Sequence, residues 1–80
     1  MELEIWDNYL TIQFGNDEVF GGQKAGVEGE CIHKGFLMYG DTMRWIEPEE
    51  KEVCTTQKKQ LVQCIINEAK KHDNIIEIEH

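Results

Sequence analysis

The residues best suited to catalysis are a cysteine and a histidine two positions apart, Cys31 and His33. On a β-strand this spacing would put the thiol and the imidazole on one face, where they could act as a nucleophile and its base. The alternative is a packing cysteine beside a polar histidine. Serine is absent from the chain, which excludes serine nucleophiles. We favour the packing interpretation and expect no enzymatic activity.

No spacing of cysteine or histidine in the chain is typical of a metal site. Cys31, Cys54 and Cys64 form no Cys-x-x-Cys pair, and there is no His-x-x-x-His pair. An odd number of cysteines also argues against a secreted disulfide framework. The glycine pair Gly21-Gly22 lacks the frame of a phosphate-binding loop. The sequence therefore predicts neither a metal nor a cofactor.

Carboxylates are the most abundant chemical groups in the chain. Sixteen Asp and Glu residues stand against eight Lys and Arg residues, so the formal net charge is −8. Such a surface repels the phosphates of nucleic acid and attracts a basic protein, because complementary charges raise association rates. The same excess could serve solubility alone. Nucleic acid is therefore an unsuitable direct partner, and a basic protein is a suitable one.

The densest acidic cluster surrounds Pro48 and follows Trp45. A partner's Arg and Lys side chains could pair with these carboxylates around an aromatic anchor. Alternatively, the cluster is a solvated linker ahead of a helix, and Trp45 belongs to the core. Glu28 and Glu30 share a strand face and could contact a partner or protect a sheet edge. The candidate contacts are Trp45, Glu47, Glu49, Glu50 and Glu52, followed by Glu28 and Glu30.

Alternation of apolar and polar residues predicts strands in the first half of the chain. Residues 2–6 and 9–14 are expected to form a hairpin with Asp7-Asn8 at its tip. After a glycine-rich loop, two further strands are expected at 27–32 and 36–39, joined by a turn at Lys34-Gly35. Residues 41–52 are interpreted as a connection. The first four strands thus form an antiparallel meander.

An amphipathic helix follows, with Thr55 or Thr56 as its cap. Asp73-Asn74 ends it, and alternation near residues 76–79 predicts a last strand. The chain is therefore one small acidic α+β domain over residues 1–80, in which one helix packs on an antiparallel sheet of about five strands, in the order ββββαβ. The apolar face of the helix comprises Leu61, Val62, Ile65, Ile66 and Ala69.

The order of several short motifs resembles that of a known family. The motifs are Gly29-Glu30, Gly35-Phe36-Leu37-Met38-Tyr39, Asp41-Thr42-Met43-Arg44-Trp45 and Pro48, followed by the Thr-initiated helix and an Ile-rich strand. Over about residues 5–79 the chain is similar to the immunity protein seventy-four family of bacterial polymorphic toxin systems. The resemblance implies a cytoplasmic antidote that binds and blocks a co-encoded toxin. It carries over no contact residue, because interfaces differ among immunity proteins.

We therefore expect a protein that binds a cognate toxin, which the acidic surface predicts to be basic, such as a nuclease. The alternative is a small regulatory or adaptor domain that binds proteins and forms a homodimer through a sheet edge or the helix. No signal peptide and no run of about 20 apolar residues is evident, so we expect a cytoplasmic protein, monomeric or homodimeric, without a membrane partner.

Overall fold

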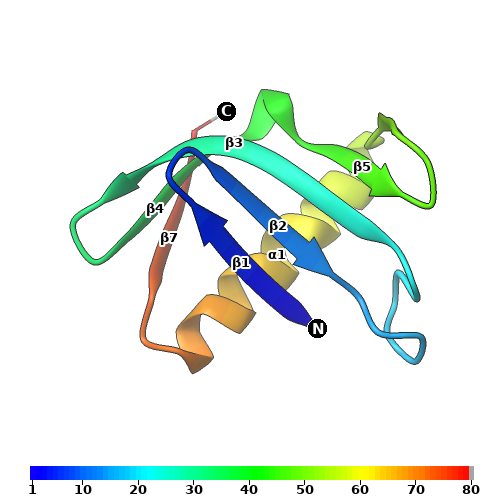
Figure 1. Cartoon of the computed structure of the whole chain (residues 1–80), viewed down its shortest axis with the longest axis horizontal. Coiled ribbons are helices and arrows are strands. Elements are labelled where there is room, and N and C mark those ends of the chain that lie inside the picture. The colour runs from blue at the N-terminus through cyan, green and yellow to red at the C-terminus, as the bar shows by residue number, and fades with distance from the viewer. Residues whose placement is uncertain (80) are drawn as a thin grey trace.

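A computed structural model describes residues 1–79, which form one bent, seven-stranded sheet with an α-helix against one face (Figure 1). The α+β class and the predicted order of the five main strands are confirmed. The elements are β1 (Glu2–Trp6), β2 (Tyr9–Gln13), β3 (Lys24–Ile32), β4 (Gly35–Tyr39), the 3-10 turn η1 (Gly40–Thr42), β5 (Arg44–Glu47), β6 (Lys51–Glu52), α1 (Thr55–Lys71) and β7 (Ile75–Glu79).

The long strand β3 joins the two halves of the sheet. Its first part, Lys24–Glu28, pairs with β2, and part of the same stretch pairs with β5 on the other side. Its second part, Gly29–Ile32, pairs with β4. β3 begins before the predicted start at Val27, because pairing with two neighbours stabilises a stretch that its own composition does not mark as a strand.

The last strand, β7, lies beside β4 and runs parallel to it. An antiparallel arrangement was expected, and at this edge the expectation is wrong. The physical reason is the path of the chain between these two strands. After β4 the chain forms β5 and β6, and α1 then crosses one face of the sheet, so that β7 starts at the same end of the sheet as β4 and runs parallel to it. The β1–β2 hairpin with its tip at Asp7-Asn8 and the β2–β3 and β3–β4 pairings are antiparallel as predicted.

Residues 41–52, predicted as a connection, contain most of η1 and the short strands β5 and β6. These strands have four and two residues, too few for alternation to mark them. β5 places Trp45 opposite Ala25 of β3, with both side chains buried. This short hairpin therefore supplies the core with its largest side chain.

The core lies between α1 and the inner face of the sheet. Of the predicted apolar face, Leu61, Ile65 and Ala69 are buried in the core, whereas Val62 and Ile66 are only half-buried. Opposite them, the strands contribute alternate residues, because successive side chains of a strand point to opposite faces. Those side chains are Leu10, Ile12, Ala25, Val27, Phe36, Met38, Trp45 and Ile76. Among the described residues, no helix is long and apolar enough to cross a membrane.

Hydrogen bonds define both ends of α1. The N-cap is Cys54, not Thr55 or Thr56, and the Gln57 side chain accepts a hydrogen bond from its N–H over 3.5 Å. At the other end, the N–H groups of Asp73 and Asn74 donate to the carbonyls of Lys70 and Ala69, at 3.3 and 2.9 Å. This is the Schellman arrangement, with Asp73 in the left-handed conformation at φ 57°.

Candidate partner-binding surface

Trp45, the aromatic residue among the predicted contacts, lies wholly inside the core. Its side chain has no exposed surface, and its ring meets Phe20 edge to face at 5.1 Å between centroids. The indole N–H donates to the Gln57 side chain over 3.2 Å, which ties β5 to the first turn of α1. Trp45 is therefore a core residue, and a partner protein cannot contact its side chain.

The acidic residues of the β5–β6 hairpin are all exposed. Glu47 ends β5, Glu52 ends β6, and Glu49 and Glu50 lie in the turn between them. Glu28 and Glu30 are also exposed, on the outer face of β3. The structure brings Glu28 and Glu52 together at one groove, whereas Glu30 lies farther along β3, where that strand pairs with β4.

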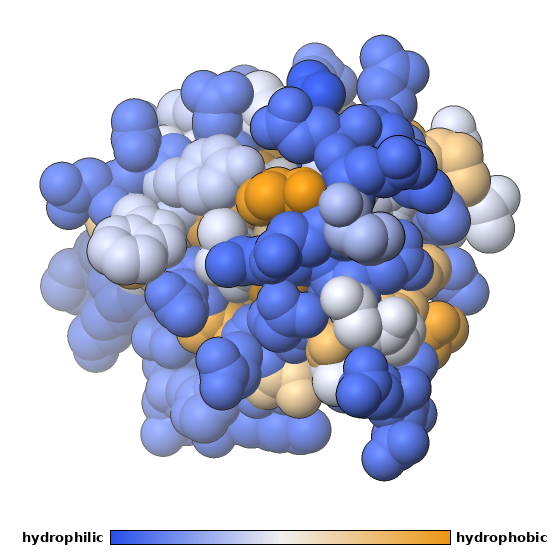
Figure 2. Space-filling model, turned by 45° about the vertical axis from the view of Figure 1, so that its right-hand side comes forward, coloured by the Kyte–Doolittle hydropathy of each residue, from blue (hydrophilic) through white to orange (hydrophobic). Residues whose placement is uncertain are grey.

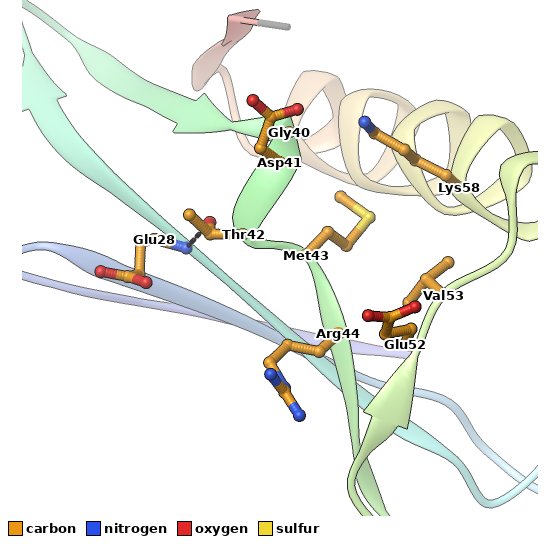
Figure 3. Close-up of a pocket in the computed structure, with 9 residues that line it drawn as sticks. All are labelled: Glu28, Gly40, Asp41, Thr42, Met43, Arg44, Glu52, Val53 and Lys58. Atoms are coloured by element: carbon orange, nitrogen blue, oxygen red, sulfur yellow. Dashed lines mark hydrogen bonds between the residues drawn. The ribbon is translucent and has the colours of Figure 1, made fainter.

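That groove lies between η1, β5, β6 and the start of α1 (Figure 3). It has a volume of about 370 Å³ and is lined by acidic and basic side chains alike. Thr42 braces its wall: its hydroxyl accepts from the Glu28 N–H over 2.8 Å and donates to the Tyr39 carbonyl over 2.7 Å. Lys58 extends from α1 toward Asp41, and the Arg44 guanidinium points away from the groove. This mixed lining selects neither an anion nor a cation.

The outer face of the sheet, opposite α1, carries a group of apolar and aromatic side chains that we call the aromatic patch. It consists of Trp6, Tyr9 and Ile46, together with the buried, polar Thr11. Trp6 faces Tyr9 across the β1–β2 hairpin, and its side chain is 59% exposed. In Figure 2, pale and orange side chains gather in the upper left of the view, and further ones lie along its right-hand side. Trp6 is therefore displayed to solvent beside other large side chains rather than alone.

Gly26 lets the patch lie close against the sheet. A Cβ at this position would collide with the Tyr9 ring and with the Ile46 side chain. Because glycine leaves that space empty, Tyr9 and Ile46 converge over the backbone of β3 from the strands on either side. The shape of the patch is thus set by strand pairing.

Charged groups surround Tyr9. Burial raises the pKa of its hydroxyl above the ordinary value, the Glu28 and Glu50 carboxylates raise it further, and the Arg44 guanidinium opposes them. Glu4, on β1, lies opposite Thr11 in the next row of the sheet. The aromatic patch thus has an acidic rim, formed by Glu4, Glu28 and Glu50, while two cations, Arg44 and Lys24, lie on the same face of the sheet.

A second acidic zone covers the outer face of β4 and β7. Glu30 and Glu77 flank Leu37 from the two neighbouring strands, and Glu79 lies beside Tyr39. Burial raises the pKa of the Tyr39 hydroxyl, and the Glu30 and Glu79 carboxylates raise it further. Carboxylates therefore lie at both ends of the outer face, around the aromatic patch and over β4 and β7.

Cys31 and His33 do not form the strand pair that their spacing suggested. β3 ends at Ile32, and His33 lies in the turn before β4, so strand alternation does not relate the two side chains. The Cys31 thiol instead approaches the Asp7 carbonyl at 3.5 Å. Cys64 is half-buried against the core, and burial raises the pKa of its thiol. Within residues 1–79, no group of three or more Cys, His, Asp or Glu side chains is arranged to hold a metal.

Sequence reasoning missed Trp6 and Tyr9 as candidate contacts. The signal was present for Trp6, because alternation in β1 puts it on the same face as Glu2 and Glu4, opposite Leu3. A tryptophan on the polar face of a strand is the informative exception in an amphipathic pattern. For Tyr9, the signal depends on knowing the partner strands.

Fold and surface together define a small acidic α+β domain whose sheet is covered by a helix on one face and leaves an acidic face with an aromatic centre on the other. The chain belongs to the Immunity protein 74 family, whose model matches residues 2–79. The family name implies a toxin as partner. No curated protein and no solved structure matches the chain significantly.

Proposed function

We propose that this chain is an antidote that binds a cognate bacterial toxin in the cytoplasm and neutralises it by direct, stoichiometric contact. The observation that carries the proposal is the family match over residues 2–79. Neutralisation by contact requires only that the complex persist longer than the time in which a free toxin would meet its target. It therefore needs neither a catalytic group nor a cofactor on this chain.

We further propose that the toxin surface it covers is basic. Two features support this: the net charge of −8, and the spread of exposed carboxylates over the outer sheet face and the β5–β6 hairpin. Complementary charge accelerates encounter and suppresses wrong partners. The substrate groove of a nuclease is a basic surface of this kind, since it must bind phosphates.

The test uses the protein encoded by the gene adjacent to that of this chain. Co-expression is expected to restore growth that the toxin alone abolishes, and calorimetric titration is expected to show one-to-one binding with a Kd of about 10⁻⁸ M or tighter. Asp17→Lys, an exposed charge reversal outside the strands, serves as a control that keeps protection. Absence of both binding and protection would overturn the proposal.

A further inference from the structure

We propose that the aromatic patch and its acidic rim form the docking surface for the toxin, and that the toxin meets it with arginine or lysine side chains around an apolar contact. The inference deepens the proposed function and rests on it. Three features of the structure carry it: the exposure of the patch, its composition, and the charges around it.

The patch lies on a sheet face that no element of the described chain covers. α1 packs on the opposite face, and Trp6 remains 59% exposed. Other large apolar side chains are exposed as well, among them Val19 in a loop and Ile75 at the start of β7. What sets Trp6 apart is an aromatic neighbour: Tyr9 pairs with it across the hairpin, and Ile46 meets Tyr9 over Gly26.

The composition of the patch is that of an interface centre. Tryptophan, tyrosine and arginine are enriched where truncation costs the most binding energy, and near-neutral polar contacts surround them. Here Trp6, Tyr9 and Ile46 provide the centre and Arg44 lies beside it. Because strand pairing sets the backbone positions, little conformational freedom has to be lost when a partner binds.

The charge of the acidic rim determines which kind of partner the patch can bind. Glu4, Glu28 and Glu50 come from β1, β3 and the β5–β6 turn, so carboxylates approach the patch from three directions. A basic partner meets opposite charge on each side. A second copy of this chain would instead bring the same carboxylates face to face, which like-charge repulsion disfavours. The surface therefore suits a basic toxin better than a homodimer.

Two other surfaces, the groove beside Thr42 and the β5–β6 turn, carry carboxylates but lack an exposed aromatic centre. The groove beside Thr42 mixes acidic and basic side chains and has no aromatic centre. The β5–β6 turn presents carboxylates around the exposed Pro48, but its own residues supply no aromatic side chain. The Glu50 carboxylate of that turn lies close enough to raise the pKa of Tyr9, so the hairpin contributes charge to the surface that we propose without being its centre.

The decisive variant is Trp6→Ser, matched by Val19→Ser, which removes an equally exposed apolar side chain from a loop. Trp6→Ser is expected to weaken toxin binding about 30-fold, the effect typical of a central tryptophan, whereas Val19→Ser changes it less than about twofold. Circular dichroism and thermal unfolding establish that both variants fold. If Trp6→Ser binds the toxin as tightly as the wild type, the proposed docking surface is wrong.

The rim is tested by charge reversal at matched net charge. Glu28→Lys is expected to slow association about tenfold at low salt, and the difference from wild type should shrink as salt rises. Asp17→Lys changes the net charge equally but lies in the loop after β2, and its association rate should stay close to wild type. Equal slowing by both variants would show that net charge, rather than the rim, steers the toxin.

The wild-type chain provides a measurement that needs no folded variant of the patch. It has two tryptophans, exposed Trp6 and buried Trp45, so acrylamide quenches mainly Trp6 in the free protein. Binding of a toxin whose own tryptophans are replaced by phenylalanine should abolish this quenching. Persistent quenching in the saturated complex contradicts the docking surface while the proposed function stands. Failure of the wild type to bind at all overturns both, and a Trp6-dependent homodimer in sedimentation would replace the toxin with a second copy.

Discussion

Tyr9 is the residue at which the apolar and acidic parts of the outer face meet. Its hydroxyl is partly withdrawn from water, and two carboxylates and one guanidinium lie around it. Each of these groups acts on the phenol in a known direction, because a negative neighbour disfavours the phenolate and a positive one favours it. The titration of this residue therefore reports the local charges of the rim.

We predict that Glu28→Gln lowers the pKa of Tyr9 and that Arg44→Gln raises it further, both from a starting value above the ordinary one of about 10. Ultraviolet absorbance in a Tyr39→Phe background isolates Tyr9, since Tyr39 is the other tyrosine of the chain. The direction of each shift is the readout. Shifts of the same sign in the two variants would mean that these groups do not surround Tyr9 as described.

The same shift fixes the sign of an alkaline effect on stability. Because folding raises the pKa of Tyr9, the folded state holds this proton more tightly than the unfolded state. The contribution to stability is complete below the ordinary tyrosine pKa and is lost as pH rises through the folded value. The free energy of unfolding should accordingly decline on the alkaline side, beginning near pH 10.

At the scale of elements, the helix shows how far the sequence determined the fold. The spacing of Leu61, Ile65 and Ala69 identified the buried face, because helical periodicity depends only on local order. The predicted capping residue, Thr55 or Thr56, was wrong. The N-cap is Cys54, whose thiol is a weak acceptor, and the Gln57 side chain accepts hydrogen bonds from both the Cys54 N–H and the Trp45 indole N–H. That arrangement depends on a contact between β5 and α1, which no local pattern contains.

The sheet, like the helix, has some features that local sequence predicts and others that depend on contacts between distant segments. The β1–β2 hairpin followed from alternation and a two-residue turn, both local features. The parallel pairing of β4 with β7 and the short strands β5 and β6 depend on where the chain goes after leaving each element. The same holds for the candidate surface. Its acidic residues could be listed from the sequence, but the convergence of Tyr9 and Ile46 over Gly26 follows only from the register of β2, β3 and β5.

The C-terminal end of α1 offers a direct test of element geometry. Asp73 adopts a left-handed conformation at φ 57°, and its carboxylate lies at the negative end of the helix dipole. Asp73→Gly should relieve both conditions and raise the free energy of unfolding by roughly 0.5–1 kcal/mol in urea denaturation. Asp73→Asn, which removes only the charge, should give a smaller gain of about 0.3 kcal/mol. A loss of stability in Asp73→Gly would contradict the Schellman arrangement.

At the scale of the whole molecule, the fold separates its two faces by role. The inner face and α1 bury the apolar side chains, whereas the outer face concentrates carboxylates on a chain that already carries a net charge of −8. Such self-repulsion opposes the compact state while it favours encounter with a basic partner. A surface suited to binding is therefore expected to cost the free protein some stability.

That cost can be measured at Glu77, which shares its row of the sheet with Glu30 on the far side of Leu37. Glu77→Lys replaces repulsion with attraction and should raise the midpoint of thermal unfolding by about 1–3 °C at low salt. Asp17→Lys makes the same change in net charge away from this row, so it should raise the midpoint less. Near 1 M salt, where screening acts within about 3 Å, the two variants should converge. A gain in Glu77→Lys that survives high salt would assign the effect to packing or strand propensity, and the acidic face would then carry no electrostatic cost.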